Sequence, residues 1–320
     1  MSNKEQQEEN KRLHIRNKNC EQYDLEALKM AIPKLADYIK PNEYGYDSVD
    51  FASPIAVRLL NKAILKHYYG IHYWEFPKEN LSPPIPGRAD YIHFMADLLA
   101  ENNLGIIPTG DKITCLDIGV GASCIYPIIG VTEYDWKFIG SDVDSKSLQS
   151  AKKIANENPA LKEKLEFRLQ TSKTNIFNGI INHTEKIDVA ICNPPYHASS
   201  KEAQRGAQKK VSNLTGVNTE NPILNFAGIR NELITEGGEY NFVISMIYES
   251  RKYAKNFFWF STLVSKESNL LGIYKTFEKF EVPHVKTIPI ETGNKFGRII
   301  AWSFLTEEEQ KEWRTKRWNH

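Results

Sequence analysis

From residue 114 onward, short apolar runs alternate with stretches whose apolar residues recur at helical spacing. The apolar runs predict strands at 114–118, 137–141, 165–169, 189–192 and 240–244, with helices between them that include 145–156 and 225–235. Such alternation is typical of βαβ units and of a parallel sheet covered by helices. Later runs predict antiparallel strands because only short turns separate them, at 259–264, 284–289 and 298–304. We therefore expect a doubly wound, mostly parallel α/β sheet that ends in an antiparallel hairpin.

The first 80 residues lack this alternation. Residues 1–12 are polar and are expected to be disordered, whereas residues 24–69 carry apolar residues at helical spacing. Closely spaced prolines in 81–87 resist helix formation and predict a stiff connector that delivers Arg88 to the head of a helix through Leu99. We expect a small helical extension over 1–80, one main domain over 81–308 and a basic tail over 309–320.

The composition excludes several classes of protein. A chain of 320 residues with 41% hydrophobic and 25% charged residues is an ordinary folded protein with one main core. The four cysteines include no Cys-x-x-Cys pair, so we expect neither a metal site nor a disulfide framework. Because no export signal and no long uncharged apolar stretch is evident, we expect a cytoplasmic protein with no membrane partner.

A glycine-rich turn directly follows the first strand of the main domain, in the segment 115–123 (CLDIGVGAS). Gly119 and Gly121 lack the β-carbons that would stop a ligand from approaching the backbone, and the following helix presents free amides. We assign these glycines, with Asp117 and Ser123 of the same motif, to a nucleoside-cofactor site. A phosphate site is less favoured because the lysine of a Walker loop is missing. A tight turn without a ligand remains the alternative for this motif alone.

An acidic residue ends the next predicted strand, about 20 residues after the glycine turn. This spacing places the Asp142 carboxylate where it can accept both hydroxyls of a ribose across the same crevice. Asp144 is expected to cap the following helix. An aspartate after a strand is by itself more often a cap than a ligand, so the prediction depends on the pairing with the glycine turn.

The third motif is Asn193-Pro194-Pro195-Tyr196, which also follows an apolar strand. Two consecutive prolines hold the backbone extended, so the Asn193 side-chain oxygen and the Pro194 carbonyl can both accept from one amine. Two such acceptors orient the lone pair of an NH2 group without a strong base, and Tyr196 offers a face on which a base can stack. We assign all four residues to catalysis, and Asn193 to the cofactor site as well. A Pro-Pro turn that merely ends a strand is the structural alternative.

Together, these motifs resemble the class I methyltransferases that act on planar amines or amides. A closer resemblance is to the bacterial 23S rRNA adenine-N6 methyltransferases of the RlmF kind, from about Leu13 to Phe304, and the same core is similar to the catalytic domain of eukaryotic small nuclear RNA adenine methyltransferases. The stretches that carry it are 48–52 (SVDFA), 83–93 (PPIPGRADYIH), 117–127 (DIGVGASCIYP), 177–181 (FNGII) and 301–304 (AWSF).

This resemblance implies a Rossmann-like fold, S-adenosylmethionine as the methyl donor and one adenine of large-subunit rRNA as the substrate. It also suggests that Arg88 binds the methionine carboxylate, a role that suits a guanidinium at a rigid position. The chain departs from the family pattern at Tyr196, where phenylalanine is commoner, and at Asp142, where glutamate is frequent. Both changes keep the stacking face or the carboxylate.

Basic residues near the third motif are candidates for RNA contact. The loop 197–221 has few apolar residues and carries Arg205, Lys209 and Lys210, and Lys295 and Arg298 lie near a later glycine-rich turn. We expect these cations to bind RNA electrostatically, and we expect the protein to act as a monomer.

Three other functions use the same features. The Asn-Pro-Pro-Tyr motif also serves methylation of a protein glutamine amide, and another nucleic acid could supply the adenine. A non-enzymatic alternative is an RNA-binding protein that keeps the fold without methyl transfer. The Arg88 connector, the basic loop and the complete set of motifs favour the RNA methyltransferase.

Overall fold

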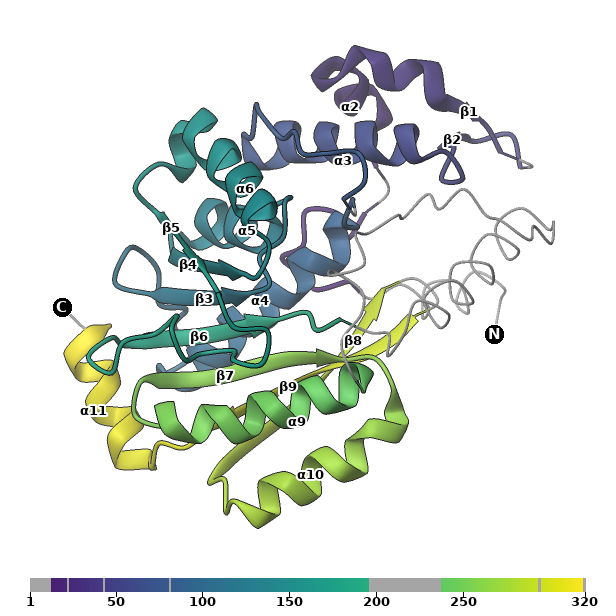
Figure 1. The fold of residues 1–320 in the computed structure, drawn as a ribbon. Coiled ribbons are helices and arrows are strands. Elements are labelled where there is room, and N and C mark those ends of the chain that lie inside the picture. The colour runs from purple at the N-terminus through teal and green to yellow at the C-terminus, as the bar shows by residue number, and fades with distance from the viewer. Residues whose placement is uncertain are drawn as a thin grey trace.

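A seven-stranded sheet forms the centre of the molecule. The structure is a computed structural model that describes residues 13–21, 23–42, 44–80, 82–195, 237–292 and 295–318. The strand order is β5-β4-β3-β6-β7-β9-β8 (Figure 1). In chain order the strands are β3 (Thr114–Ile118), β4 (Lys137–Asp142), β5 (Leu165–Leu169), β6 (Ile187–Cys192), β7 (Phe257–Val264), β8 (His284–Thr292) and β9 (Lys295–Ser303).

Strands β5, β4, β3, β6 and β7 are mutually parallel, and the β8–β9 hairpin adds antiparallel pairing at one edge. The mostly parallel sheet with an antiparallel C-terminal hairpin is therefore confirmed. The segment 259–264, expected to be antiparallel, is instead a parallel neighbour of β6 and pairs antiparallel only with β9. It is buried along its whole length because it lies between two other strands.

One predicted strand is wrong. Residues 240–244 lie inside helix α9 (Gly238–Ser250), whose buried residues include Val243, Met246, Ile247 and Ser250. This spacing of three and four residues places them on one helical face. A window of five residues was too short to separate this period from a strand pattern. The predicted helix at 225–235 lies outside the described residues.

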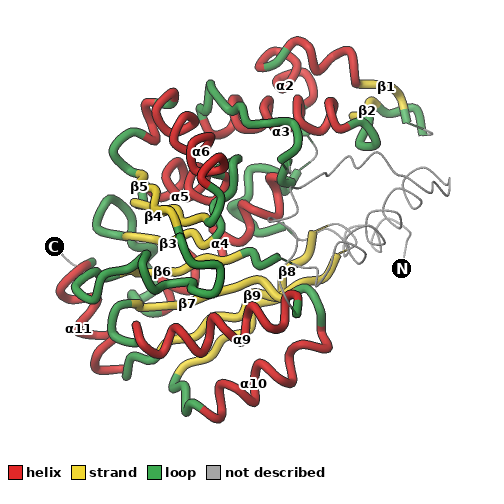
Figure 2. The backbone as a smooth tube through the Cα atoms, viewed as in Figure 1, coloured by secondary structure: helices red, strands yellow, loops and turns green. Residues whose placement is uncertain are grey.

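Helices cover both faces of the sheet (Figure 2). Alternate strand residues point to opposite faces, so Cys115, Val189 and Ile191 pack with one set of helices, whereas Leu116 and Ala190 pack with the other. The first set is α3 (Pro54–Tyr69), α4 (Ile85–Glu101), α5 (Ile125–Tyr134) and α6 (Ser145–Glu157). The second set is α9 and α10 (Leu270–Lys279).

The N-terminal extension contains α2 (Leu25–Ala31) and α3, and also a two-stranded hairpin of β1 (Ile39–Pro41) and β2 (Asp47–Val49) that the sequence did not predict. Buried side chains of the extension, such as Leu28 and Ile64, share one hydrophobic core with Ile92 of α4 and Ile128 of α5. The extension is thus packed directly onto the helices that flank the sheet.

Most of the basic segment expected over 309–320 lies in a docked helix. Helix α11 (Glu307–Arg317) begins with a capping box made by Thr306 and Glu309. The fully buried Asp188 of β6 accepts hydrogen bonds from Trp313 Nε1 at 2.7 Å and Trp318 Nε1 at 2.8 Å. Arg317 also forms an ion pair with Asp188 at 2.8 Å, so this basic residue contributes to the packing of α11 against the sheet.

Of the helices in the described part of the chain, none is both long and apolar enough to cross a membrane.

Candidate active site

The three sequence motifs meet at one edge of the sheet. Strand β3 pairs in register with both β4 and β6 up to its last residue, Ile118. Gly119, Asp142 and Asn193 therefore occupy neighbouring positions at the carboxyl ends of three adjacent parallel strands. Ligands of open α/β sheets bind at this edge, where connections leave the sheet in opposite directions.

The glycine turn is held open by its own backbone. Gly119 and Gly121 both have positive φ, 75° and 64° respectively, which glycine adopts without strain. A β-carbon at either position would meet no atom of the described residues within 4 Å, which leaves space above the turn for a ligand. The Gly119 amide donates to the carbonyl of Ser141 at 2.9 Å. Trp74 Nε1 donates to the carbonyl of the buried Ser123 at 2.8 Å, which fixes the far end of the turn.

Two carboxylates lie beneath the turn. Asp142 accepts hydrogen bonds from the backbone amides of Gly121 and Asp144, each at 2.9 Å. Asp117 is 1% exposed, and neither of its carboxylate oxygens has a hydrogen-bond partner among the residues that the structure describes. Burial, with the nearby charge of Asp142, raises the pKa of Asp117 well above its usual value, whereas the charge of Arg88 acts in the opposite direction. An unpartnered buried carboxylate is costly and therefore suits a cationic ligand group.

Burial also raises the pKa of Asp142, although its backbone hydrogen bonds oppose that shift. Asp144 caps α6 as predicted, because its side chain accepts from the amide of Lys146 at 3.1 Å.

The proline connector places Arg88 near these carboxylates. Asn61 of α3 donates to the carbonyl of Pro83 at 2.9 Å and thereby fixes the chain just before α4 begins. Arg88 lies in the first turns of α4, with its guanidinium 5.6 Å from the centre of the Tyr126 ring. Asn61 had no recognisable signal in the sequence, because its role depends on a contact between segments 22 residues apart.

The acceptor loop begins immediately after β6. Asn193 and Pro195 are half-buried and Pro194 is buried. Tyr196, expected to provide the stacking face, lies outside the described residues. The register of β6 with β3 brings the start of this loop beside the glycine turn.

The hydroxyl groups of Tyr91 and Ser261 are a further pair that the sequence did not single out. Tyr91 of α4 reaches the backbone of Cys192, the residue before Asn193, with contacts of 3.4 Å to its amide and to its carbonyl. Ser261 of β7 lies 2.9 Å from the Tyr91 hydroxyl. Only the tertiary structure brings these three segments together.

Comparison with known proteins identifies the family. A family model described as an RNA methyltransferase matches residues 7–306. This chain belongs to that family. The resemblance noted from the sequence is thereby confirmed.

Relatives of this RNA methyltransferase share most of its length. The ribosomal RNA large subunit methyltransferase F of Cytophaga hutchinsonii is 51% identical over 96% of this chain and 95% of its own. The protein of the same name from Yersinia enterocolitica is 47% identical, over 96% of this chain and 92% of its own.

Two solved structures share the fold. The hMettl16 catalytic domain in complex with the MAT2A 3′UTR hairpin 1 superposes with a TM-score of 0.76 at 29% identity, over 92% of this chain and 96% of that one. The N-terminal domain of human METTL16 in complex with SAH superposes with a TM-score of 0.72 at 26% identity, over 92% and 99% of the two chains.

The RNA-contact residues expected from the sequence are only partly within the described region. Arg205, Lys209 and Lys210 lie outside it. Lys295 is the first residue of β9, and Arg298 of the same strand pairs with Val264 at the carboxyl end of β7. Both residues therefore belong to the hairpin beside the active-site edge of the sheet. Arg298 forms an ion pair with Glu267 at 3.2 Å.

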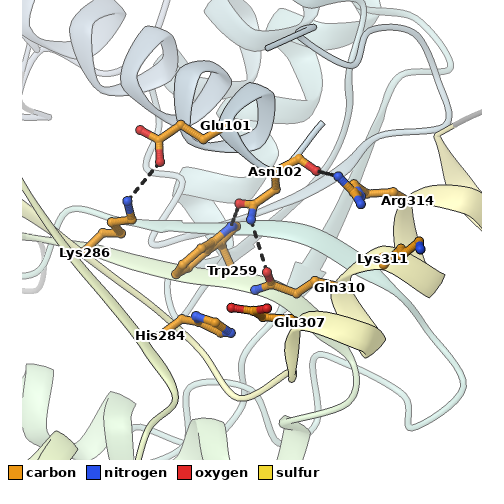
Figure 3. Close-up of a pocket in the computed structure, with 9 residues that line it drawn as sticks. All are labelled: Glu101, Asn102, Trp259, His284, Lys286, Glu307, Gln310, Lys311 and Arg314. Atoms are coloured by element: carbon orange, nitrogen blue, oxygen red, sulfur yellow. Dashed lines mark hydrogen bonds and ion pairs between the residues drawn. The ribbon is translucent and has the colours of Figure 1, made fainter. Parts of the chain in front are cut away.

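A separate pocket of ≈ 380 Å³ lies at the amino-terminal ends of β7 and β8, between the end of α4 and α11 (Figure 3). Polar contacts within its wall link Lys286 to Glu101 at 3.1 Å and the side chain of Asn102 to Gln310 at 3.1 Å. Because the parallel strands carry their catalytic loops at the opposite edge, we assign this pocket no role in methyl transfer.

Proposed function

We propose that this enzyme transfers a methyl group from S-adenosylmethionine to the N6 amine of an adenine in 23S rRNA of the large ribosomal subunit. The observation that carries the proposal is the position of the Asn193 loop, whose two carbonyl acceptors lie next to an open glycine turn and an unpartnered buried carboxylate. Relatives that match nearly the whole chain are named for methylation of large-subunit rRNA.

The site fits this cofactor group by group. Asp117 offers two unpartnered carboxylate oxygens to the methionine ammonium. Asp142 can accept from the ribose hydroxyls, and Gly119 and Gly121 leave room for close approach of the nucleoside. Arg88 carries the charge that a methionine carboxylate requires. When bound, S-adenosylmethionine supplies an electrophilic methyl group on a sulfonium.

The acceptor loop orients the nucleophile. The side-chain oxygen of Asn193 and the carbonyl of Pro194 accept the two hydrogens of an adenine amine, so its lone pair faces the methyl donor. Such positioning contributes to rate because the reacting groups no longer need to find their alignment from solution. The acceptors need not remove a proton first, since the amine loses its proton after it has attacked.

The target base enters the site unstacked from its neighbours, with Tyr196 as its stacking platform. The basic residues of the segment 197–221 and of the β8–β9 hairpin supply contacts to the RNA backbone. RNA complexes of the structurally similar hMettl16 catalytic domain support an RNA acceptor over a glutamine amide. Because the substrate is ribosomal RNA, we place the enzyme in the cytoplasm.

Replacing Asn193 with alanine tests the proposal. The N193A variant should lose methyl transfer to rRNA while its Kd for S-adenosylhomocysteine stays within about twofold, because all the other proposed cofactor residues lie on other elements. The assay combines labelled methyl donor with purified 23S rRNA or total protein, followed by mass spectrometry of the digested RNA. Full activity of N193A, or label in protein amides rather than in N6-methyladenine, contradicts the proposal.

A further inference from the structure

Strands β6 and β7 separate just before the acceptor loop. Their ladder runs from the pair Ile187–Phe257 to the pair Ala190–Phe260. On the other side of β6, the ladder with β3 continues to Cys192. The last residue of β6 is therefore held by strand pairing on one side only, although Asn193 follows it directly.

The hydroxyl groups of two buried side chains occupy the place where β6 and β7 separate. Tyr91 and Ser261 are both 0% exposed, and Cys192 is 1% exposed. Ser261 Oγ donates to the carbonyl of Ala190 at 2.6 Å. The Tyr91 hydroxyl lies 2.9 Å from Ser261 Oγ and 3.4 Å from the amide nitrogen of Cys192.

Each hydroxyl has a single proton, and this limits the possible directions of the hydrogen bonds. The proton of Ser261 is used on the carbonyl of Ala190, so Ser261 accepts from the Tyr91 hydroxyl, which itself accepts from the Cys192 amide. The Cys192 carbonyl, 3.4 Å from the Tyr91 hydroxyl, is the second acceptor for the same Tyr91 proton. Burial raises the pKa of Tyr91 well above its usual value, so its hydroxyl keeps the proton that it donates. The pair thus replaces the missing β6–β7 ladder with side-chain hydrogen bonds.

We propose that Tyr91, supported by Ser261, is a positioning residue that holds the backbone at Cys192 and so sets the orientation of the Asn193 acceptor group. Tyr91 lies one helical turn after Arg88 on α4. Its ring packs edge-on against the Tyr126 ring, with the two ring centres 5.4 Å apart. Helix α4 therefore connects the cofactor side of the site to the acceptor loop.

This inference rests on the proposed role of Asn193 in binding the amine. Tyr91 itself does not touch the reacting atoms. Its contribution is geometric, because small displacements of a group that orients a nucleophile reduce the rate strongly. A loss of orientation should lower kcat and leave the affinities for cofactor and RNA nearly unchanged.

The test is the Y91F variant, which keeps the buried ring and removes only the hydroxyl. We expect kcat for rRNA methylation to fall about tenfold or more. KM for rRNA and Kd for S-adenosylhomocysteine should stay within about twofold. S261A should lower kcat in the same way, and the Y91F/S261A double variant should be little slower than Y91F, because both substitutions break one chain of hydrogen bonds.

Y134F provides a matched control. The Tyr134 hydroxyl is also buried and has two partners, Arg16 Nε at 3.0 Å and His93 Nδ1 at 2.6 Å, but it lies at the end of α5 that is remote from the glycine turn. Y134F should reduce thermal stability about as much as Y91F and leave kcat unchanged.

Three outcomes overturn the inference: Y91F with unchanged kcat, equal kcat losses in Y91F and Y134F, or a kcat loss that is accompanied by loss of cofactor affinity. If Y91F does not fold, S261A provides the same test. An inactive N193A with a fully active Y91F refutes only the role of Tyr91, whereas a fully active N193A refutes the proposed function itself.

Discussion

Replacing Asp117 with asparagine should stabilise the free protein and weaken cofactor binding at the same time. Both carboxylate oxygens of Asp117 are buried and have no partner within the described part of the chain, and burial and the charge of Asp142 raise its pKa well above the usual value. The folded state therefore binds this proton more tightly than the unfolded state. Its contribution to the free energy of unfolding falls as pH rises above the unfolded pKa of about 3.9.

An uncharged amide of the same shape removes the pH-dependent cost of the titrating carboxyl, although the amide remains a buried polar group without a partner. Each pH unit above the unfolded pKa adds up to about 1.4 kcal/mol to that cost, and the unpaired amide offsets part of the gain, so D117N should increase the free energy of unfolding of the cofactor-free protein by about 1–3 kcal/mol at neutral pH. A hydrogen bond to a charged group contributes about 1.5–3 kcal/mol, so losing the contact to the methionine ammonium should raise Kd about 10- to 150-fold.

Urea unfolding without cofactor measures the first effect, and calorimetric titration with S-adenosylhomocysteine measures the second. D142N is the matched control, because Asp142 accepts two backbone hydrogen bonds that its amide would satisfy only in part. D142N should weaken cofactor binding and also lower stability. A D117N protein that is less stable than the wild type, or one whose Kd changes less than twofold, refutes the reasoning about Asp117.

Further predictions concern pH, the C-terminal helix and the glycine turn. Burial, and to a smaller extent the nearby charges of His14 and Arg16, lower the pKa of His93 to about 3. The stability that neutral His93 contributes is therefore present above about pH 6.5 and is lost as the pH falls toward 3. H93Q should reduce the slope of this decline by up to about 1.4 kcal/mol per pH unit, measured by urea unfolding at a series of pH values. D188A should lower the free energy of unfolding by about 3–5 kcal/mol, measured by tryptophan fluorescence, because it leaves buried donors unpaired. G121A should cost about 1 kcal/mol and raise the Kd for S-adenosylhomocysteine roughly tenfold, because its φ is 64° and its β-carbon enters the open space.

Each of these has a control within the chain. G70A places alanine at a similar φ of 67° with open space around it, remote from the site, and should leave Kd unchanged. R317M should destabilise less than D188A, because its side chain is 26% exposed and the tryptophan hydrogen bonds remain. Equal pH slopes for wild type and H93Q, or equal Kd values for G121A and wild type, contradict the respective arguments.

Local pattern was sufficient where a motif and its function lie on one short segment. The strand and turn at 114–123, the strand at 165–169 and the cap at Asp144 depend on neighbouring residues, and the structure has them where the sequence predicts them. Parallel strands place their carboxyl ends at one edge, so the meeting of Gly119, Asp142 and Asn193 also followed from the sequence.

The local pattern of apolar residues led to a wrong prediction where a short apolar run fits a strand and a helix equally well. Residues 240–244 satisfied a strand pattern, yet their burial follows the helical period of α9. The C-terminal charges indicated a separate basic tail over 309–320, because charge runs usually face water. The buried carboxylate of Asp188, more than 120 residues earlier, instead holds Arg317 and two tryptophans of that segment.

The sequence by itself determined most strands of the sheet, the family and the three motifs of the candidate site, because each depends on residues close together in the chain. Tertiary structure alone decided which buried groups have partners. Among the described residues it left Asp117 without a partner, and it gave the Cys192 backbone a partner in Tyr91, 101 residues away. No local period encodes such contacts, because they arise only when helices and strands pack.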